Sequence, residues 1–517
     1  MRQIDEAEQP EYREIGSECA ASLEDPVSRI AAERFGVSYL YPLQRMAMAN
    51  ILDSVHRDEP FRQLVLFPTG FGKSLCFQLP ALLLPGLTLV VYPLLALMND
   101  QKRSLEKRGI ASCLIRGGMD ETERLSCMKN LEEGRYKILI TNPESLIQPK
   151  LAAFLERLGI FHAAVDEAHC VSEWGETFRP SYLELGSCLT RLKPKVLSAF
   201  TATASPVVAS AIVERLFGKE NYSLVTADMD KPNLKYSVCQ TGSASHSLCR
   251  LLGELPKPAI VFGQSRAGVR RICEMASERT GLETRFYHAG LSRQEKEDTE
   301  AWFLGSKDGV LAATCAYGMG VDKKDIRTVI HFSSPSSAEA YIQEAGRGGR
   351  DGEACRAILI HDVLREGEDT EIESKNRDKS PTGPDLSRKA RSESFRAYPR
   401  GRGCRRESLL AMMGSSLESP CSGCDVCEGE ARSEDEAEGL VELFAFLKAH
   451  PGRFSKADCI RLLLGDEKGE PPCCAGSGAL SSWEPKDLRA LLTGALAKKL
   501  VIQAERGFRK GRLYPHL

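Results

Sequence analysis

The sequence has little net charge and no uninterrupted apolar run of the length that crosses a membrane. Its 517 residues carry 69 Lys and Arg against 71 Asp and Glu, so the chain is not a general polycation, and contact with an acidic polymer must use local basic surface. The most apolar stretch, residues 79–98, is interrupted by Pro80, Pro85, Gly86 and Pro93, which predicts a helix end, a buried strand, a turn and a new helix. The N-terminus lacks the apolar core of a secretory signal, so we expect a cytoplasmic protein with reduced thiols and no membrane contact.

Short apolar runs alternate with helical segments in two successive sets. Continuous apolar strands between helices are typical of a parallel sheet that is buried on both faces. We therefore predict an α/β protein with two tandem parallel-sheet lobes. The expected strands are residues 64–67, 88–92, 137–141, 163–165 and 195–200 in the first lobe and 259–262, 284–287, 309–313, 328–332 and 357–361 in the second.

Changes in composition divide the chain into five parts. We predict an N-terminal extension at residues 1–25, the two lobes at 26–228 and 229–363, a polar connector with a cysteine cluster at 364–430, and a small C-terminal module of helices and a hairpin at 437–517. The segment 229–233 is the predicted hinge between the lobes, and the connector is expected to be mobile or loosely helical.

A glycine-rich turn, PTGFGKS at residues 68–74, joins a predicted strand to a predicted helix. Such a turn directs free backbone N–H groups at an anion, and its glycines let the backbone approach closely. Lys73 can reach terminal phosphates and Ser74 can ligate Mg²⁺. Phe67 stands where the strict pattern has glycine, so an ordinary strand–turn–helix remains the alternative. The predicted nucleotide contacts here are Thr69, Gly70, Gly72, Lys73 and Ser74.

Two adjacent carboxylates, Asp166 and Glu167, follow the predicted strand at residues 163–165. The carboxyl edge of a parallel sheet is where ligands bind. Asp166 can hold a metal ion there and Glu167 can accept a proton from an attacking water, which fits metal-assisted phosphoryl transfer.

Four cysteines have the spacing of a metal site: Cys404, Cys421, Cys424 and Cys427. Four thiolates suit tetrahedral zinc, and the compact run of three also occurs in iron–sulfur proteins. The sequence by itself leaves both metals open. A zinc site of this composition would be structural and closed.

The motifs PTGFGKS, DEAHCVSEWGETFRPSY, SAFTATAS and YIQEAGRGGRDG occur in this order, and with them the chain resembles superfamily 2 helicases, most closely the RecQ family of DNA helicases, over residues 35–427. The resemblance implies two RecA-like lobes, an ATP-dependent 3′–5′ DNA helicase that acts in recombination and repair, and ATP and Mg²⁺ as ligands. It also favours zinc at the four cysteines.

The resemblance also assigns roles to further residues. It implies that Gln44 reads the adenine, although Val37 and Tyr41 depart from the family pattern there. Arg347 and Arg350 would act as arginine fingers. The aromatic-rich loop, with Trp174, Phe178 and Arg179, would bind unstacked bases. A second set of residues would couple ATP hydrolysis to contact with the DNA strand: His169, Thr201, Thr203 and Gln343.

The C-terminal module ends in a basic hairpin that suits contact with duplex phosphates, with Arg509 and Lys510 as candidates. By its position this module resembles the family's winged helix, and no further helical DNA-binding domain is expected after it. A charge run of this kind is also compatible with an ordinary solvated face.

The expected partners are single-stranded and forked duplex DNA, with a single-strand-binding protein as a candidate, and we expect a monomer that in a bacterial cell lies at the nucleoid. Three alternatives stay open: a DNA-stimulated translocase that does not separate strands, a non-catalytic DNA-binding scaffold, and an RNA helicase. The intact phosphate loop, acidic pair and arginines argue against the scaffold.

Overall fold

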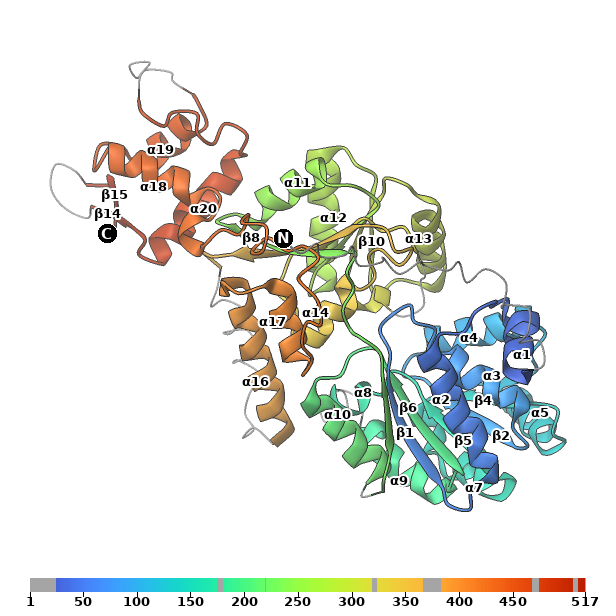
Figure 1. Ribbon diagram of the computed structural model, residues 1–517. Coiled ribbons are helices and arrows are strands. Elements are labelled where there is room, and N and C mark those ends of the chain that lie inside the picture. Colours follow the sequence, from blue (N-terminus) through green and yellow to red (C-terminus); the bar gives the residue numbers. More distant parts are fainter. Residues whose placement is uncertain are drawn as a thin grey trace, which may run out of the picture.

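A computed structural model describes residues 25–173, 180–218, 220–318, 323–365, 383–466, 474–504 and 510–516. Two α/β lobes lie one above the other, and a smaller C-terminal module projects from the second lobe (Figure 1). None of the helices in these ranges is both long and apolar enough to cross a bilayer.

The first lobe is a seven-stranded parallel sheet with helices on both faces. The strand order is β3-β4-β2-β5-β6-β1-β7. The central strands are short apolar runs that are buried along nearly their whole length, as a sheet covered on both faces requires. The strands are β1 (Phe61–Leu66), β2 (Leu87–Val91), β3 (Ser112–Leu114), β4 (Ile138–Thr141), β5 (Ile160–Val165), β6 (Val196–Thr201) and β7 (Ser223–Thr226).

The helices of the first lobe connect these strands and cover them. They are α1 (Pro26–Phe35), α2 (Pro42–Asp53), α3 (Leu75–Leu83), α4 (Leu95–Lys107), α5 (Glu121–Glu132), α6 (Pro143–Leu146), α7 (Pro149–Leu158), α8 (Cys170–Glu173), α9 (Ser181–Leu192) and α10 (Pro206–Ile212), with short turns η2 (Ser54–His56) and η3 (Val213–Phe217). The apolar stretch 79–98 forms the end of α3, strand β2 and the start of α4, which confirms the interrupted pattern predicted from its prolines.

The second lobe is a six-stranded parallel sheet of order β10-β11-β9-β12-β13-β8. Its strands are β8 (Leu234–Thr241), β9 (Ala259–Phe262), β10 (Thr284–Tyr287), β11 (Val310–Ala313), β12 (Thr328–His331) and β13 (Cys355–Asp362). Its helices are α11 (Ala244–Glu254), α12 (Arg266–Thr280), α13 (Arg293–Gly305), α14 (Ala338–Ala345) and the short turn η4 (Cys315–Gly318). All ten predicted strands are present, and β3, β7 and β8 are additional.

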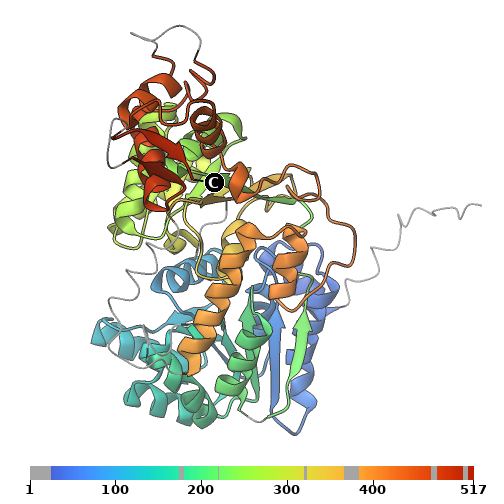
Figure 2. The same cartoon turned by 90° about the vertical axis from the view of Figure 1, so that its left-hand side faces the viewer.

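The connector is more ordered than the sequence indicated, because residues 383–397 form the long helix α16 (Gly383–Ala397). Phe395 on this helix is 1% exposed and joins the core of the second lobe. The turn η5 (Tyr398–Arg400) and helix α17 (Arg405–Met412) follow, and Figure 2 shows these orange elements extending from the second lobe toward the first. The connector is therefore a packed extension of the second lobe in this part.

The C-terminal module is built around its own apolar core. It contains the turn η6 (Glu434–Glu436), helices α18 (Leu440–Ala449), α19 (Lys456–Leu463) and α20 (Pro485–Ala497), and the antiparallel pair β14 (Val501–Gln503) and β15 (Leu513–Pro515). Helices followed by a hairpin agree with the arrangement expected from the sequence.

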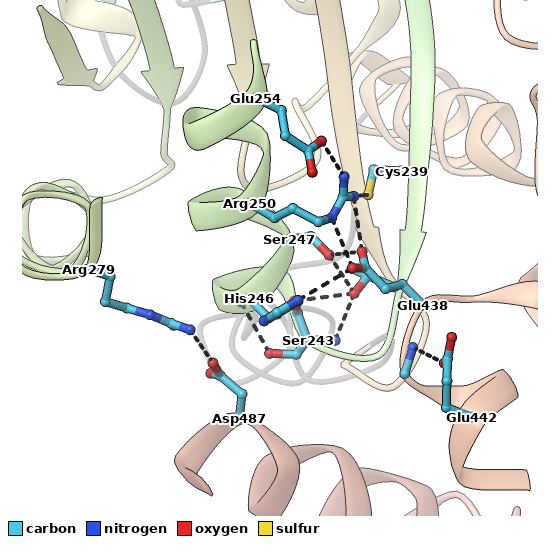
Figure 3. Close-up of polar contacts among 12 residues, drawn as sticks. Cys239, Ser243, His246, Ser247, Arg250, Glu254, Arg279, Glu438, Glu442 and Asp487 are labelled. Atoms are coloured by element: carbon cyan, nitrogen blue, oxygen red, sulfur yellow. Dashed lines mark hydrogen bonds and ion pairs between the residues drawn. The ribbon is translucent and has the colours of Figure 1, made fainter. Parts of the chain in front are cut away.

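Buried charges attach this module to the second lobe (Figure 3). Arg279 on α12 pairs with Asp487 on α20 at 2.7 Å, and both side chains are under 10% exposed. Glu438 accepts hydrogen bonds from Arg250 on α11. The Trp483 ring stacks on His246, with centroids 4.3 Å apart. The contact is thus specific in charge and shape.

Candidate nucleotide site and metal centre

The carboxyl ends of three neighbouring strands, β5, β6 and β1, carry most of the predicted site. Leu66 at the end of β1 lies opposite Thr201 at the end of β6, and Val165 at the end of β5 lies opposite Ala199 on β6. The phosphate loop, the acidic pair and the coupling threonines therefore emerge at one edge of one sheet, as parallel pairing requires.

The phosphate loop runs from the end of β1 to Ser74, which caps α3. Gly70 and Gly72 have φ of 89° and 77°, a backbone conformation that side chains with a Cβ rarely adopt. A Cβ at Gly72 would also lie 2.7 Å from Nε2 of Gln44. Lys73 donates from Nζ to the Phe67 carbonyl at 3.3 Å. The loop thus has the glycine conformations that close approach of an anion needs.

Gln44 fixes the loop from the side of α2. Its Nε2 donates to the Phe71 carbonyl at 2.7 Å, and its Oε1 accepts from the Tyr41 backbone at 2.9 Å. The Tyr41 ring stacks on Phe71 with centroids 5.2 Å apart, and Tyr39 meets Tyr41 edge to face. Both tyrosines are more than half exposed. The segment that departs from the family pattern thus presents aromatic surface beside the loop.

Asp166 and Glu167 lie at the end of β5. Burial and the neighbouring charge of Glu167 raise the pKa of Asp166 to about 7, although Lys73 opposes the shift. Glu167 has a φ of 48°, a strained value for a residue with a side chain, and its buried Oε2 has no hydrogen-bond partner among the described residues, although His169 Nδ1 lies 3.4 Å away. Strain and an unsatisfied carboxylate oxygen are costly, and such costs are typical of functional sites.

The predicted coupling residues form a short chain beside the acidic pair. His169 Nδ1 lies 2.9 Å from Thr201 Oγ1 and 3.4 Å from Glu167 Oε2. Thr201 Oγ1 in turn donates to the Thr203 carbonyl at 3.2 Å. Gln343 is on α14 in the other lobe, where it is partly buried.

The two predicted arginine fingers, Arg347 and Arg350, lie in the loop that follows α14 and are not part of that helix. Arg347 is 5% exposed, and its Nε has no hydrogen-bond partner among the described residues. Burial and the charge of Arg350 lower the pKa of Arg347 to about 10, while Glu167 of the first lobe opposes this effect. Arg347 and Glu167 therefore lie within electrostatic reach of each other across the lobes.

A further cation at this cleft, Lys231, was missed from the sequence. It belongs to the hinge, and it lines a narrow cleft together with Thr69 and Thr203 of the first lobe and Gly346 of the second. Burial, then Arg350 and Lys73, lower the pKa of Lys231 to about 8. Its position in a proline-containing hinge is the signal that could have identified it.

The four cysteine sulfurs lie within 4.8 Å of one another. Tetrahedral zinc with Zn–S of about 2.3 Å needs sulfurs about 3.8 Å apart, so this group fits the metal. Burial raises the pKa of the Cys424 thiol, but hydrogen bonds from the N–H groups of Cys427 and Arg405 outweigh burial and lower it below its usual value. Donors aimed at a sulfur favour the thiolate that metal binding requires.

A buried ion pair supports the cysteine cluster. Arg405 donates from Nε to Asp425 Oδ1 at 2.9 Å, and both side chains are under 5% exposed. Asp425 Oδ2 accepts a hydrogen bond from the Val238 backbone N–H at 2.8 Å. The backbones of Cys424 and Tyr236 pair in an isolated parallel β-bridge. The cluster thus covers the free edge of β8, which joins it to the second lobe.

The resemblance also implies a DNA-contact or coupling role for the segment YHAGLS at residues 287–292, which begins at the end of β10. His288 is 2% exposed, and neither of its ring nitrogens has a hydrogen-bond partner among the described residues. Burial, together with Arg270 and Arg266, lowers the pKa of His288. These groups lie in and beside the YHAGLS segment.

Several predicted site residues are not placed by the structure. Trp174, Phe178 and Arg179 of the aromatic-rich loop and Arg509 of the hairpin lie outside the described residues. Lys510 is exposed next to β15. Two other basic groups of the hairpin region have partners within the protein: Lys498 donates to the Val363 carbonyl, and Arg512 pairs with Asp458.

Comparison with known families agrees with this geometry. Residues 41–211 match the DEAD/DEAH box helicase family, and residues 243–352 match the helicase conserved C-terminal domain. Two RecA-like lobes that carry these motifs on facing edges define a two-lobed helicase of superfamily 2.

The curated relatives narrow this class. A RecQ ATP-dependent DNA helicase of Pasteurella multocida is 32% identical over 430 residues, which cover 81% of this chain and 65% of that protein. This chain thus spans slightly less than two thirds of that relative. The RecQ helicase of Bacillus subtilis is 30% identical over 410 residues, or 78% of this chain and 68% of that protein. The chain belongs to the RecQ family of ATP-dependent DNA helicases.

Among solved structures, the DUF1998 helicase MrfA bound to DNA matches with a TM-score of 0.52 and 20% sequence identity. The match covers 78% of this chain and 56% of that one. This likeness supports the two-lobed fold.

Proposed function

We propose that this chain hydrolyses ATP between its two lobes and uses the resulting closure and opening to move 3′ to 5′ along single-stranded DNA and to unwind a duplex. One observation supports the proposal: the charge of Glu167 in the first lobe acts on Arg347 of the second, and Lys73 of the first lobe acts on Lys231 together with Arg347 and Arg350 of the second. Cations from both lobes within electrostatic reach of one another and of a carboxylate suit a magnesium-bound nucleoside triphosphate.

Each group has a defined task in this proposal. The backbone of residues 69–74 binds the phosphates, with Lys73 neutralising their charge. Ser74 and Asp166 supply the hard oxygen ligands that Mg²⁺ prefers, and the ion, when bound, offsets the phosphate charge. Glu167 accepts the proton of the attacking water. Arg347 and Arg350 stabilise the charge that develops on the transferred phosphate.

Adenine recognition falls to Gln44 and the neighbouring tyrosines. Both amide ends of Gln44 contact backbone groups of its own segment and of the phosphate loop. Tyr41 offers an exposed ring beside the loop for stacking. We infer that stacking on Tyr41 substitutes for the aromatic that the family pattern has at Val37.

DNA contact is proposed on both lobes. The loop with Trp174, Phe178 and Arg179 would stack unpaired bases, and Arg266 and Arg270 beside His288 would contact the DNA backbone. The series of contacts from His169 through Thr201 to Thr203 would couple Glu167 to the DNA-binding segments of the first lobe. Gln343 would have the corresponding coupling role in the second lobe. Arg509 and Lys510 would meet the duplex in a winged-helix-like module. We propose that the parts of the chain that carry these roles are the predicted domains at residues 26–228, 229–363, 364–430 and 437–517. We also propose that the protein acts as a monomer and has a single-strand-binding protein as a partner.

Zinc at the four cysteines would act as a structural metal. The sulfur spacing fits tetrahedral coordination, and the edge of β8 that the cluster covers explains what the metal would stabilise. All four positions are thiols, so the site would be closed and would take no part in the chemistry.

A polarity-resolved unwinding assay tests the proposal. Duplex DNA with a 3′ tail or with a 5′ tail is incubated with ATP and the protein, with Lys73→Ala as the inactive control. We expect unwinding of the 3′-tailed substrate alone. ATP hydrolysis stimulated by DNA without strand separation would establish a translocase instead, and the absence of any DNA-stimulated hydrolysis would refute the motor.

A further inference from the structure

The hinge is fastened to the loop that carries the arginines. It joins β7 to β8, and two of its side chains reach across to that loop. Lys231 donates from Nζ to the Gly346 carbonyl at 2.7 Å, and Asn233 donates from Nδ2 to the Gly349 carbonyl at 2.7 Å. These two hydrogen bonds lie on either side of Arg347 in the sequence.

The hinge backbone is itself held from the opposite side. Arg406 on α17 is 1% exposed and donates to the carbonyls of Lys231 and Leu234. Arg406 also pairs with Asp230. Arg406 therefore restricts the backbone of the hinge, and the bond from Nζ to the Gly346 carbonyl directs the Lys231 side chain toward the arginine loop.

The charge environment of Lys231 is unfavourable for a cation. It lines the cleft with Pro68 and Thr69 of the phosphate loop. The charges that act on it include Arg350, Lys73 and Arg347, all of them positive, and the partial opposing effect comes from the Cys355 thiol. Several cations around one small volume repel each other unless an anion lies between them. An anion in the cleft that Lys231 lines would relieve this repulsion, so the arrangement suits a polyanion.

We propose that Lys231 is a contact for the terminal phosphate of the nucleoside triphosphate and that, together with Asn233, it positions the Arg347 loop from the hinge. An ammonium group has three donors, so Lys231 can keep its bond to Gly346 while it donates to a phosphate oxygen. The nucleotide would then be sensed at the segment about which the lobes move. This inference rests on the proposed ATP hydrolysis.

The test compares four variants with the full-length wild-type protein. Lys231→Met removes the charge, Lys231→Arg keeps it, Asn233→Ala removes the second hinge contact, and Lys129→Met is the matched control on an exposed helix. The measurements are kcat and KM for DNA-stimulated ATP hydrolysis and equilibrium binding of a non-hydrolysable ATP analogue and of ADP. Thermal unfolding is recorded for every variant.

For Lys231→Met we expect kcat to fall about 10-fold or more and the preference for the triphosphate over ADP to be lost, because the contact is made to the terminal phosphate. Lys231→Arg should restore most of both quantities, as the charge and donors return. Asn233→Ala should lower kcat and leave the preference for the triphosphate intact. Lys129→Met should behave as wild type.

The outcomes separate the inference from the function it rests on. If the wild-type protein does not hydrolyse ATP, the proposed function fails. If the wild type hydrolyses ATP and Lys231→Met matches Lys129→Met, the inference about the hinge is overturned and the function stands. The inference is also overturned if Lys231→Met weakens ADP and triphosphate binding equally along with thermal stability, since that pattern shows a purely structural role.

Discussion

Replacing Glu438 with Gln tests how firmly the C-terminal module is attached to the second lobe (Figure 3). The Glu438 carboxylate accepts from Arg250 Nε at 2.9 Å and Nη2 at 3.1 Å and from Ser247 Oγ at 2.8 Å, and its side chain is 15% exposed. Its backbone N–H donates to Gln240 and its carbonyl accepts from Gly242. Gln preserves the size of the side chain and the backbone bonds, but it removes the charge and replaces one acceptor oxygen by an amide N–H2 group that faces donors.

The size of the effect follows from the pKa of Glu438. Burial raises this pKa, but hydrogen bonds from His246 and Arg250 outweigh burial and lower it from 4.5 to about 2. One pKa unit corresponds to about 1.4 kcal/mol, and with a discount for partial solvent screening we expect the charge to contribute about 2 kcal/mol at neutral pH. Because the folded pKa lies below the unfolded one, this contribution is complete above the unfolded pKa of 4.5 and is lost as pH falls toward 2.

Denaturant unfolding at several pH values measures this contribution. Trp483 stacks on His246 at the contact, so its fluorescence reports undocking of the module. The matched control is Glu254→Gln, because Glu254 pairs with the same Arg250 at 2.8 Å but is 57% exposed. An exposed pair of this kind contributes about 0.5 kcal/mol or less.

We expect Glu438→Gln to lower the unfolding midpoint of this transition clearly at pH 7, to do so less at pH 4, and to approach the wild type at still lower pH. Equal effects of the two substitutions would refute the reasoning, as would a difference from wild type that does not change with pH. Either result would mean that the buried charge network is not what holds the module in place.

Three further predictions concern the two candidate sites. Glu167→Gln should leave ATP binding intact and lower hydrolysis about 100-fold or more, measured as phosphate release at saturating ATP and DNA. Gly72→Ala should weaken ATP binding at least about 10-fold, because its Cβ would lie 2.7 Å from Gln44 Nε2 in a backbone conformation that alanine disfavours, whereas Gly117→Ala has open space and should bind normally. Cys424→Ala should abolish zinc binding in elemental analysis and lower the thermal stability of the second lobe; full stability without metal would contradict a structural zinc site.

The sheets show where local patterns are sufficient. All ten predicted strands occur, and most of them are short apolar runs buried on both faces, a pattern that needs no knowledge of its neighbours; the exception is the half-buried edge strand β10. Strand β3 has three residues, too few to produce a pattern. Strand β8 alternates buried and half-buried residues because it lies at the edge of its sheet, and its partner residues Cys424 and Glu438 come from far along the chain.

The connector shows the opposite case. Its composition is charged and polar, which favours a mobile or loosely helical segment. The structure nevertheless places Phe395 and Tyr398 in the core of the second lobe, where they stack against each other. A few buried aromatic contacts with distant residues outweigh the local composition, and those contacts have no signature in the segment itself.

The sequence by itself determined which chemical groups this protein can bring to a site: a glycine-rich loop with its lysine, a pair of carboxylates after a strand, two arginines in a glycine-rich segment and four cysteines at metal spacing. These are local features, because backbone conformation and side-chain chemistry within a few residues define them. The tertiary structure decided which groups share one volume. The place of Lys231 among the cations of both lobes, the reach of Arg347 toward Glu167 and the charges that hold the C-terminal module depend on how separate elements pack, and packing is a property of the whole chain.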